Sequence, residues 1–256
     1  MNDRDIRRKL GQNYLSDPAI IFEMGQAISP QKGNHILEIG PGMGALTNTV
    51  NKEGVNIKAI DVDKKNIDFL SSEFKGPGNF DFIHGNILKT PLDFLNETQH
   101  RIIGNLPYNI STQIILMFTD WVSEIQDMHF LVQKEVAQKI CGEVATKNWG
   151  KLGIKLSAFF NTQILFDVPP EAFDIKPKVT SSFIRLTPNN ELNIDAATKS
   201  NLYKVVDLSF GSRRKNIRNN LKKQSFDWDS LGIDNNLRPE EIPLVDYLKL
   251  AKAYKE

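Results

Sequence analysis

The feature that most constrains the fold is a regular alternation of apolar runs and helical patterns over about the first 180 residues. An apolar run at 36–39 leads into a glycine cluster and then a helical pattern, and further strand-like runs follow at 56–63, 80–88 and 101–108. Parallel strands need a crossover connection, usually a helix, between them. The alternation therefore predicts an α/β fold with a doubly wound, mostly parallel sheet.

The helices expected in this part of the chain lie at 17–28, 64–74 and 111–121. The first of them has Asp17 as a cap and Pro18 in its first turn, a typical helix start. A strand beginning near 127 should become a helix near Lys134. The segments 152–169 and 181–188 show strand-like alternation, which predicts two strands that pair at a sheet edge.

A polar, turn-rich segment at 187–193 predicts a domain boundary, with one domain over 1–187 and a second over 188–256. In the second part, apolar residues recur at spacings of three and four over 195–210, 214–223 and 239–254. This spacing is typical of amphipathic helices, so we expect a small α-helical C-terminal domain.

Composition excludes several classes of protein. The single cysteine, Cys141, allows no internal disulfide bond and is expected to be a small buried apolar residue. No stretch approaches the roughly 18 apolar residues of a membrane span. The charged N-terminus has no apolar segment typical of a signal peptide, so we expect a cytoplasmic protein without a membrane partner.

The charge is unevenly distributed, although the formal net charge is only +1. The basic segment, residues 212–223, has six cations and no acid. They are Arg213, Arg214, Lys215, Arg218, Lys222 and Lys223. A second group of cations lies at 4–9. One such cluster can be an ordinary solvated face, but two clusters on a nearly neutral chain favour contact with a nucleic-acid backbone.

Three polar features follow three successive predicted strands. Gly40, Gly42 and Gly44 follow the first strand with G-x-G-x-G spacing, which differs from the G-x-G-x-x-G that binds a pyrophosphate. Asp61 ends the second strand, where a carboxylate can accept from both hydroxyls of a ribose. Asn86 follows the third strand and could contact an adenine edge. Together they suit a nucleoside without phosphate, and S-adenosylmethionine fits.

The stretch RIIGNLPYNIST at 101–112 ends the fourth predicted strand with Asn105, Leu106, Pro107 and Tyr108. By itself it could be a simple turn, since the residue before a proline avoids the helical region.

The sequence resembles the adenine N6,N6-dimethyltransferases of small-subunit ribosomal RNA. The resemblance rests on ordered motifs along most of the chain. They are GQNYL, ILEIGPGMGALT, AIDVD, NIL, IIGNLPYNIST, QKEVAQKI, VPPEAFDIKPKVTSSFIRL, RRKNIRNNL and LRPEEIPLVDYLKLA. It implies a Rossmann-like methyltransferase domain at 1–187 and an RNA- or ribosome-binding domain at 188–256. It also implies two adjacent adenines in a hairpin near the 3′ end of 16S rRNA as substrates, within the immature small subunit, and a monomer.

The resemblance also assigns residue roles. It implies that the methyl donor contacts Asn13, Leu15, Gly40, Gly42, Asp61, Asn86 and Asn105, and that Asn105 is the catalytic amide. Two positions depart from the family pattern, which usually has Asp in place of Asn86 and Pro in place of Ile175.

The chemistry explains why an amide would follow the fourth strand. The lone pair of adenine N6 is delocalised into the ring, so methyl transfer requires that the amino group be turned. The side-chain oxygen of Asn105 and a backbone carbonyl of Leu106 or Pro107 could accept its two hydrogens and stabilise the growing charge. The ring of Tyr108 could stack on the base, and we expect Phe173 to be a second stacking ring.

Three alternatives remain at this point. The chain could be a 23S rRNA adenine methyltransferase of the antibiotic-resistance type, which would share the fold and Asn105. A DNA adenine methyltransferase is disfavoured because no separate target-recognition domain is evident. A non-catalytic ribosome-assembly or transcription factor would be consistent with Asn86 but not with the intact 105–108 stretch. The four histidines are scattered and predict no metal site.

Overall fold

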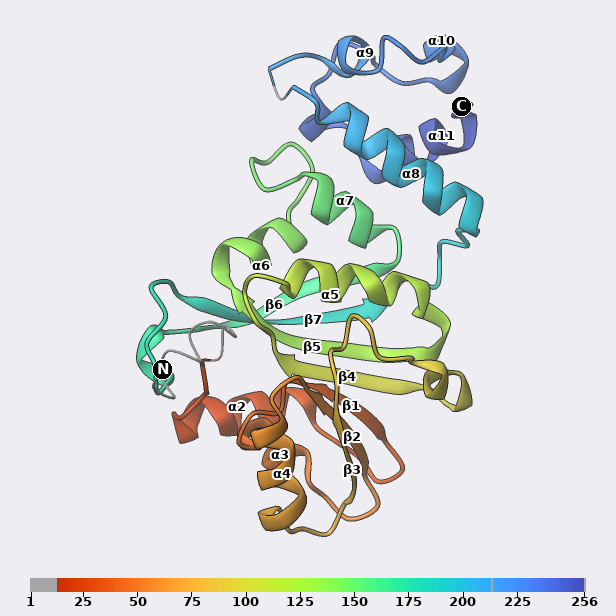
Figure 1. Cartoon of the computed structure of the whole chain (residues 1–256). Helices are drawn as coiled ribbons and strands as arrows, with labels where there is room; N and C mark the ends of the chain where they lie inside the picture. The colour runs from red at the N-terminus through yellow and green to blue at the C-terminus, as the bar shows by residue number, and fades with distance from the viewer. Residues whose placement is uncertain (1–12, 213, 256) are drawn as a thin grey trace. The chain divides into compact units, whose positions relative to one another are not determined.

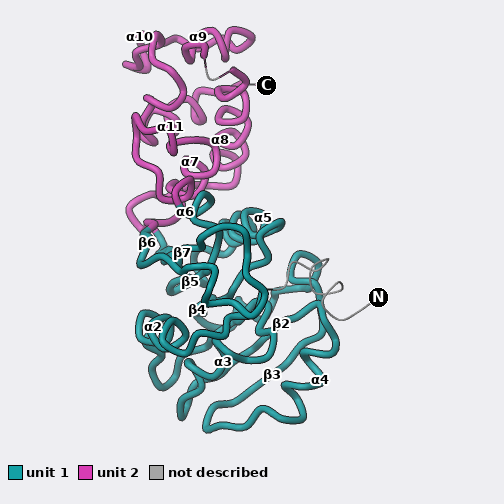
Figure 2. Tube along the Cα trace, turned by 90° about the vertical axis from the view of Figure 1, so that its left-hand side faces the viewer, with its two compact units in different colours: residues 1–137, 163–188 teal, residues 138–162, 189–256 magenta. Residues whose placement is uncertain are grey.

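The structure is a computed structural model that describes residues 13–212 and 214–255. These residues form two compact units (Figure 2). The first unit extends to Ala137 and resumes over Gln163–Pro188, and the second comprises Gln138–Thr162 and Asn189–Glu256. The division after Pro188 lies next to the predicted boundary at 187/188. The segment 138–162 differs from the prediction, since it groups with the C-terminal residues.

The strands of the described residues form one sheet in the order β3-β2-β1-β4-β5-β7-β6 (Figure 1). They are β1 (His35–Ile39), β2 (Asn56–Asp61), β3 (Asn79–His84), β4 (His100–Asn105), β5 (Ile125–Gln133), β6 (Phe160–Val168) and β7 (Ser181–Pro188). The first five strands pair in parallel, and β7 pairs antiparallel with β5. The predicted doubly wound, mostly parallel α/β sheet is confirmed, and β6 lies beside β7 at the sheet edge.

Helices connect most of these strands. The helices of the first unit are α2 (Pro18–Ile28), α3 (Ala45–Val50), α4 (Lys64–Glu73) and α5 (Ser111–Met117). The chain then enters α6 (Lys134–Ile140), which begins in the first unit and ends in the second. The second unit contains α7 (Lys151–Ser157), α8 (Ala196–Ser209), α9 (Ile217–Asn220), α10 (Trp228–Leu231) and α11 (Leu244–Ala253).

The core of the first unit lies on both faces of the sheet. On one face, α2 and α3 pack against a cluster that includes Ile36, Ile57 and Ile103 from three neighbouring strands. On the other face, the ring of Phe118, directly after α5, stacks on Phe130 of β5 with 6.4 Å between centroids. Because both faces are covered, the inner strands β1 and β4 are buried along most of their length, whereas the edge strand β3 has no buried residue.

The sequence predicts the start of α2 correctly and one later element wrongly. The side chain of Asp17 accepts from the N–H groups of Ala19 and Ile20, as a helix cap does. The expected strand at 152–159 is instead the helix α7, and only the part from Phe160 onward is a strand. The alternating apolar residues of α7 are buried on more than one side of the helix, so their pattern resembles that of a strand.

The second unit is mainly helical, as predicted. Its longest helix, α8, packs on α11, and the indole N–H of Trp149 donates to the Ile242 carbonyl (2.8 Å). The expected helix at 214–223 is much shorter, since only Ile217–Asn220 is helical. No helix among the described residues is both long and apolar enough to cross a membrane.

Candidate active site

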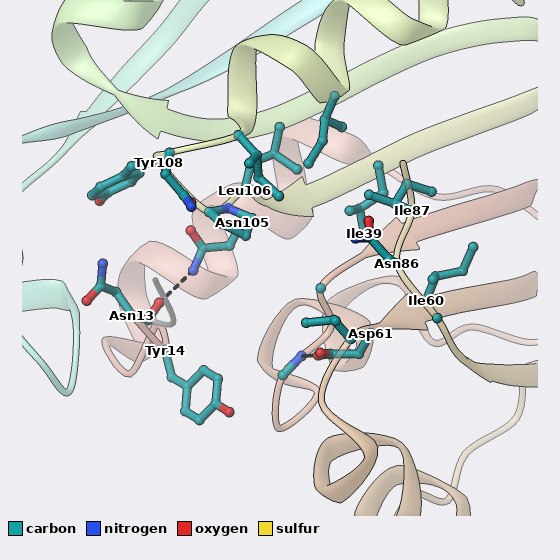
Figure 3. Close-up of a pocket in the computed structure, with 18 residues that line it drawn as sticks. Asn13, Tyr14, Ile39, Ile60, Asp61, Asn86, Ile87, Asn105, Leu106 and Tyr108 are labelled. Carbon is teal, nitrogen blue, oxygen red and sulfur yellow. Dashed lines mark hydrogen bonds between the residues drawn. The ribbon is translucent and has the colours of Figure 1, made fainter. Parts of the chain in front are cut away.

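A cavity of about 230 Å³ lies in the first unit where β1, β2, β3 and β4 end. Its lining residues come mainly from the loops after these strands and from the segment before α2 (Figure 3). The chain crosses from one side of β1 to the other between β3 and β4, so the sheet order reverses at this point. Such switch points are the usual ligand sites of open α/β sheets.

The glycine loop after β1 is shaped for close approach of a ligand. Gly40, Gly42 and Gly44 all have positive φ, between 56° and 84°. A Cβ atom on Gly42 would lie 2.9 Å from the ring of Tyr14, so a larger residue would displace the ring. Gly40 and Gly42 line the cavity with bare backbone, as the sequence predicts for a donor-binding loop.

Asp61 ends β2 and faces the same cavity, with 5% of its surface exposed. Its Oδ1 accepts from the Asp63 N–H (2.8 Å), and its Oδ2 accepts from the Gly42 N–H (3.2 Å) and from Asn66 Nδ2 (2.9 Å). Burial raises the pKa of this carboxyl, and the three hydrogen bonds oppose the rise. Since a carboxylate has about four acceptor positions, Asp61 retains acceptor capacity for a ribose.

Glu38, which the sequence analysis did not assign to the site, lies under the glycine loop and is 1% exposed. Burial raises its pKa to about 7, the nearby Asp61 contributes to the rise, and Thr47 opposes it. Its Oε2 has no hydrogen-bond partner among the described residues. A buried carboxyl without a complete set of partners is the kind of group that a polar ligand would satisfy.

Asn105 is the last residue of β4, and its side chain is held by the N-terminal segment. Its Nδ2 donates to the backbone carbonyl of Asn13 (2.8 Å; Figure 3). Because a carbonyl oxygen can only accept, the amide must present its nitrogen to Asn13. Its Oδ1 is therefore the atom that can accept from a substrate. The Pro107 carbonyl already accepts from the Ile110 N–H (3.1 Å), which favours the Leu106 carbonyl as the second acceptor.

Tyr108 lines the cavity with its ring while its hydroxyl is anchored. The hydroxyl lies 2.6 Å from the hydroxyl of Ser181, which is fully buried at the start of β7. Burial raises the pKa of Tyr108, and the Ser181 contact opposes the rise. The phenol is therefore neutral at physiological pH, and its fixed ring is suited to stacking on a base.

Asn86 lines the cavity in the turn after β3. Its Oδ1 accepts from the Leu88 N–H (3.0 Å). A carbonyl-type oxygen can accept a second hydrogen bond, so the residue retains the acceptor that was predicted for an adenine amino group.

The structure does not bring every predicted residue to the cavity. Phe173 does not line it, because its side chain is 3% exposed and belongs to the hydrophobic cluster that contains Leu15. The structure therefore corrects the prediction that Phe173 stacks on the base: the ring packs in the core instead. Leu15 pairs with Phe173 through an isolated antiparallel bridge and borders a smaller cavity of about 50 Å³ beside the glycine loop.

The departure at Ile175 has a local explanation. The Ile175 N–H donates to Asp174 Oδ1 (2.6 Å), a bond that proline could not form. The same oxygen accepts from the Tyr14 N–H (3.1 Å), so this turn helps to hold the segment before α2.

The basic segment lies in the second unit, and its residue Arg213 falls outside the described residues. The other five predicted cations are exposed. Asn220 holds the backbone around Arg214 and Lys215: its Oδ1 accepts from the Ser212 N–H (3.0 Å), and its Nδ2 donates to the carbonyls of Ser212, Lys215 and Asn216. The buried side chains of Ile217 and Leu221 anchor the segment to the unit.

The residues around the cavity fit an adenosyl donor that carries an amino acid. The bare glycine backbone, the strand-end carboxylate of Asp61 and the unsatisfied oxygen of Glu38 offer acceptors and space, and the described lining residues include no Lys or Arg for a phosphate. This site on this sheet places the chain among the Rossmann-like, S-adenosylmethionine-dependent methyltransferases.

Comparison with known proteins identifies the family. The model of the ribosomal RNA adenine dimethylase family matches residues 3–256. Ribosomal RNA small subunit methyltransferase A of Legionella pneumophila (strain Corby) is 39% identical over 249 residues, covering 96% of each chain. The protein of the same name from Pseudomonas fluorescens is 37% identical over 254 residues, covering 98% of this chain and 93% of the relative.

Two solved structures share the fold. A dimethyladenosine transferase from Plasmodium falciparum superposes with a TM-score of 0.80 at 20% identity, covering 92% of this chain and 95% of that one. The 23S rRNA methyltransferase ErmE superposes with a TM-score of 0.71 at 22% identity, covering 94% of this chain and 98% of that one. The chain belongs to the ribosomal RNA adenine dimethylase family and is an S-adenosylmethionine-dependent enzyme.

Proposed function

We propose that the substrates are two adjacent adenines in a hairpin near the 3′ end of 16S rRNA, which the enzyme converts to N6,N6-dimethyladenosines during small-subunit biogenesis in the cytoplasm. The support for 16S over 23S rRNA is that relatives with 36–39% identity over nearly the whole chain carry the name small subunit methyltransferase A. The similarity to ErmE, at 22% identity, concerns the fold alone.

The single observation that carries the mechanism is the hydrogen bond from Asn105 Nδ2 to the Asn13 carbonyl. It orients the amide before the substrate arrives, so that Oδ1 accepts one N6 hydrogen and the Leu106 carbonyl accepts the other. Holding both hydrogens turns the N6 lone pair out of the ring plane and stabilises the positive charge that develops on nitrogen. Bound S-adenosylmethionine supplies the methyl group from a sulfonium centre.

Tyr108 provides the stacking surface for the extruded base, and its bond to Ser181 fixes the ring. The methylated nitrogen is acidic enough to lose its proton to water, so no strong general base is required. The pocket must then accept the monomethylated base a second time. Asn13, Gly40, Gly42, Asp61 and Asn86 hold the donor in this proposal, and Leu15 supports the segment behind them.

We assign the basic segment to the phosphates of the rRNA. The exposed residues Arg214 and Lys215 lie on a loop that Asn220 shapes, Arg218 lies on α9, and Lys222 and Lys223 follow that helix. Arg213 belongs to the same run of sequence. Exposed cations on a fixed loop suit backbone contacts, which position an RNA without reading its sequence.

The test is incubation of the full chain with isotopically labelled S-adenosylmethionine and immature small subunits, followed by nucleoside analysis of the rRNA. We expect two N6,N6-dimethyladenosines per 16S molecule, and methylation by the Asn105→Ala variant should be at least about 100-fold slower. Large subunits incubated in parallel provide the comparison. Label in 23S rRNA would contradict the proposed substrate, and donor binding without any labelled adenosine would indicate a non-catalytic protein.

A further inference from the structure

A chain of hydrogen bonds connects the segment before α2 with the carboxylate at the end of β2. The hydroxyl of Tyr14 donates to Asn66 Oδ1 (3.0 Å), and Asn66 Nδ2 donates to Asp61 Oδ2 (2.9 Å). The Gly42 N–H donates to the same carboxylate oxygen (3.2 Å). Four separate parts of the first unit therefore meet at one carboxylate: the N-terminal segment, α4, β2 and the glycine loop.

The carboxylate at one end determines the direction of each hydrogen bond in this series. A carboxylate accepts hydrogen bonds, so the amide of Asn66 must present its nitrogen to Asp61 and its oxygen to Tyr14. The opposite orientation of the amide would place two acceptor oxygens against each other in a buried site. Asn66 is 3% exposed, so water cannot replace either bond at low cost.

We propose that Tyr14 and Asn66 are positioning residues for the methyl donor, because they hold the Asp61 carboxylate in the orientation that accepts a ribose hydroxyl. The inference rests on the proposed role of Asp61. Asn66 does not line the cavity and reaches the donor site through Asp61, whereas Tyr14 also lines the cavity and packs its ring on the glycine loop.

The position of Tyr14 extends this role to the catalytic amide. Its neighbour Asn13 accepts from Asn105, and the backbone N–H and carbonyl of Tyr14 both bond to Asp174. One short segment therefore holds the ribose end of the site through a side chain and the reacting end through a backbone carbonyl. Loss of the Tyr14 hydroxyl disturbs the first of these contacts and leaves the second intact.

Charge explains why Asp61 needs this support. Its carboxylate is buried near two other acids, Glu38 and Asp63, and no described cation is paired with it. The bond from Asn66 and the two backbone N–H groups counteract the rise in the Asp61 pKa that burial causes. Without Asn66 the pKa rises further, and the protonated carboxyl becomes a poorer acceptor as the pH falls.

The experiment measures the affinity of the purified full chain for S-adenosylmethionine by titration calorimetry between pH 5.5 and 8, without RNA. The variants are Tyr14→Phe, Asn66→Leu, their double variant and Asp61→Asn. We expect a Kd about 3- to 5-fold higher for Tyr14→Phe and about 10- to 30-fold higher for Asn66→Leu, in line with losing one neutral and one charge-assisted hydrogen bond. The double variant should have the same Kd as Asn66→Leu, because the Tyr14 hydroxyl acts through the Asn66 amide.

The pH profile separates positioning from a general loss of packing. In Asn66→Leu, affinity should begin to fall at a higher pH than in the unaltered chain, whereas simple loosening would lower affinity equally at every pH. Tyr203→Phe, which removes a tyrosine hydroxyl in the second unit, is the matched control and should bind the donor like the unaltered chain.

The outcomes distinguish the two levels of the proposal. If Asp61→Asn binds the donor normally, the proposed role of Asp61 fails and the positioning role fails with it. If Asp61→Asn weakens binding but Tyr14→Phe and Asn66→Leu do not, only the positioning role is overturned. Should Asn66→Leu fail to fold, Tyr14→Phe decides, since it removes a single oxygen: unchanged affinity and an unchanged pH profile would overturn the inference.

Discussion

The donor cavity and the basic segment use polar groups in opposite ways. Around the cavity, Asp61, Asn66 and Asn105 are fixed by hydrogen bonds within the protein, and much of their surface is buried. In the basic segment the side chains of the described cations are exposed, and the fixed element is the backbone around Lys215, held by Asn220. The first arrangement suits one small ligand of defined shape, and the second suits a charged polymer.

This difference predicts how each region responds to mutation. A buried group held in one orientation contributes strongly, and its loss is felt by the partners that remain unsatisfied. An exposed cation contributes little by itself, and its contribution depends on salt. Four predictions test the comparison, from the largest expected effect to the smallest.

Asn105→Ala should lower kcat about 100- to 1,000-fold, because it removes an acceptor for the amino group and for the charge that forms on it. The Kd for RNA should change less than about 3-fold. Single-turnover methylation and RNA binding measure the two quantities separately. Asn96→Ala, which removes an exposed amide elsewhere in the first unit, is the control. Equal losses of turnover and RNA affinity would contradict the role assigned to Asn105.

Glu38→Gln should change how the free energy of unfolding depends on pH. The pKa of Glu38 is raised in the folded chain from its ordinary value of 4.5 to about 7, so the folded state favours the neutral carboxyl. Its contribution to stability is complete below about pH 4.5 and is lost as the pH rises through 7, by up to about 3 kcal/mol.

The Glu38→Gln variant remains neutral and should keep that contribution, so it should be more stable than the unaltered chain at pH 8 and similar at pH 4.5. Urea unfolding at several pH values measures the difference. The exposed Glu53→Gln serves as control. If the free energy of unfolding depended on pH in the same way in Glu38→Gln and in the unaltered chain, burial would not raise the pKa of Glu38.

The double variant Lys222→Ala/Lys223→Ala should weaken RNA binding about 10-fold at low salt. The slope of log K against log salt should fall by roughly 1 for each RNA phosphate that the protein no longer neutralises. Affinity for S-adenosylmethionine should not change. Lys52→Ala/Lys75→Ala removes the same charge from exposed positions of the first unit and is the matched control. An equal effect of both pairs would mean that only net charge matters.

Asn220→Ala should have the smallest effect, a loss of RNA affinity of about 2- to 5-fold, because it removes the bonds that shape the basic loop but none of its charges. The salt dependence should therefore remain as in the unaltered chain. The neighbouring exposed amide Asn219→Ala is the control. A changed salt slope in Asn220→Ala would indicate that the altered loop neutralises fewer phosphates.

Much of the fold and the cavity could be predicted because the signals are local. The cap at Asp17, the strand–glycine–helix pattern at 36–50 and the polar residues at strand ends all follow from short-range rules. Parallel topology then brings strand ends to one edge, so Gly40, Asp61, Asn86 and Asn105 meet without further information.

The features that the sequence did not reveal depend on contacts between distant segments. The helix α7 resembles a strand in sequence because its burial on several sides hides the helical period. Phe173 could not be distinguished from a stacking ring until its pairing with Leu15 was known. Asn66 carried no signal of its own, because it lies within an ordinary helix and acquires its role only beside Tyr14 and Asp61.

The pairing of residues 14–16 with 172–174 also has a consequence for the order of folding. The bonded residues Ser16 and Ala172 are 156 positions apart, and Tyr14 and Asp174 are 160 apart. During synthesis, all five parallel strands emerge before this partner exists, and loop-closure entropy disfavours such distant contacts until late. A nascent chain should therefore form most of its sheet first and gain affinity for the methyl donor only once the residues beyond 174 have been released.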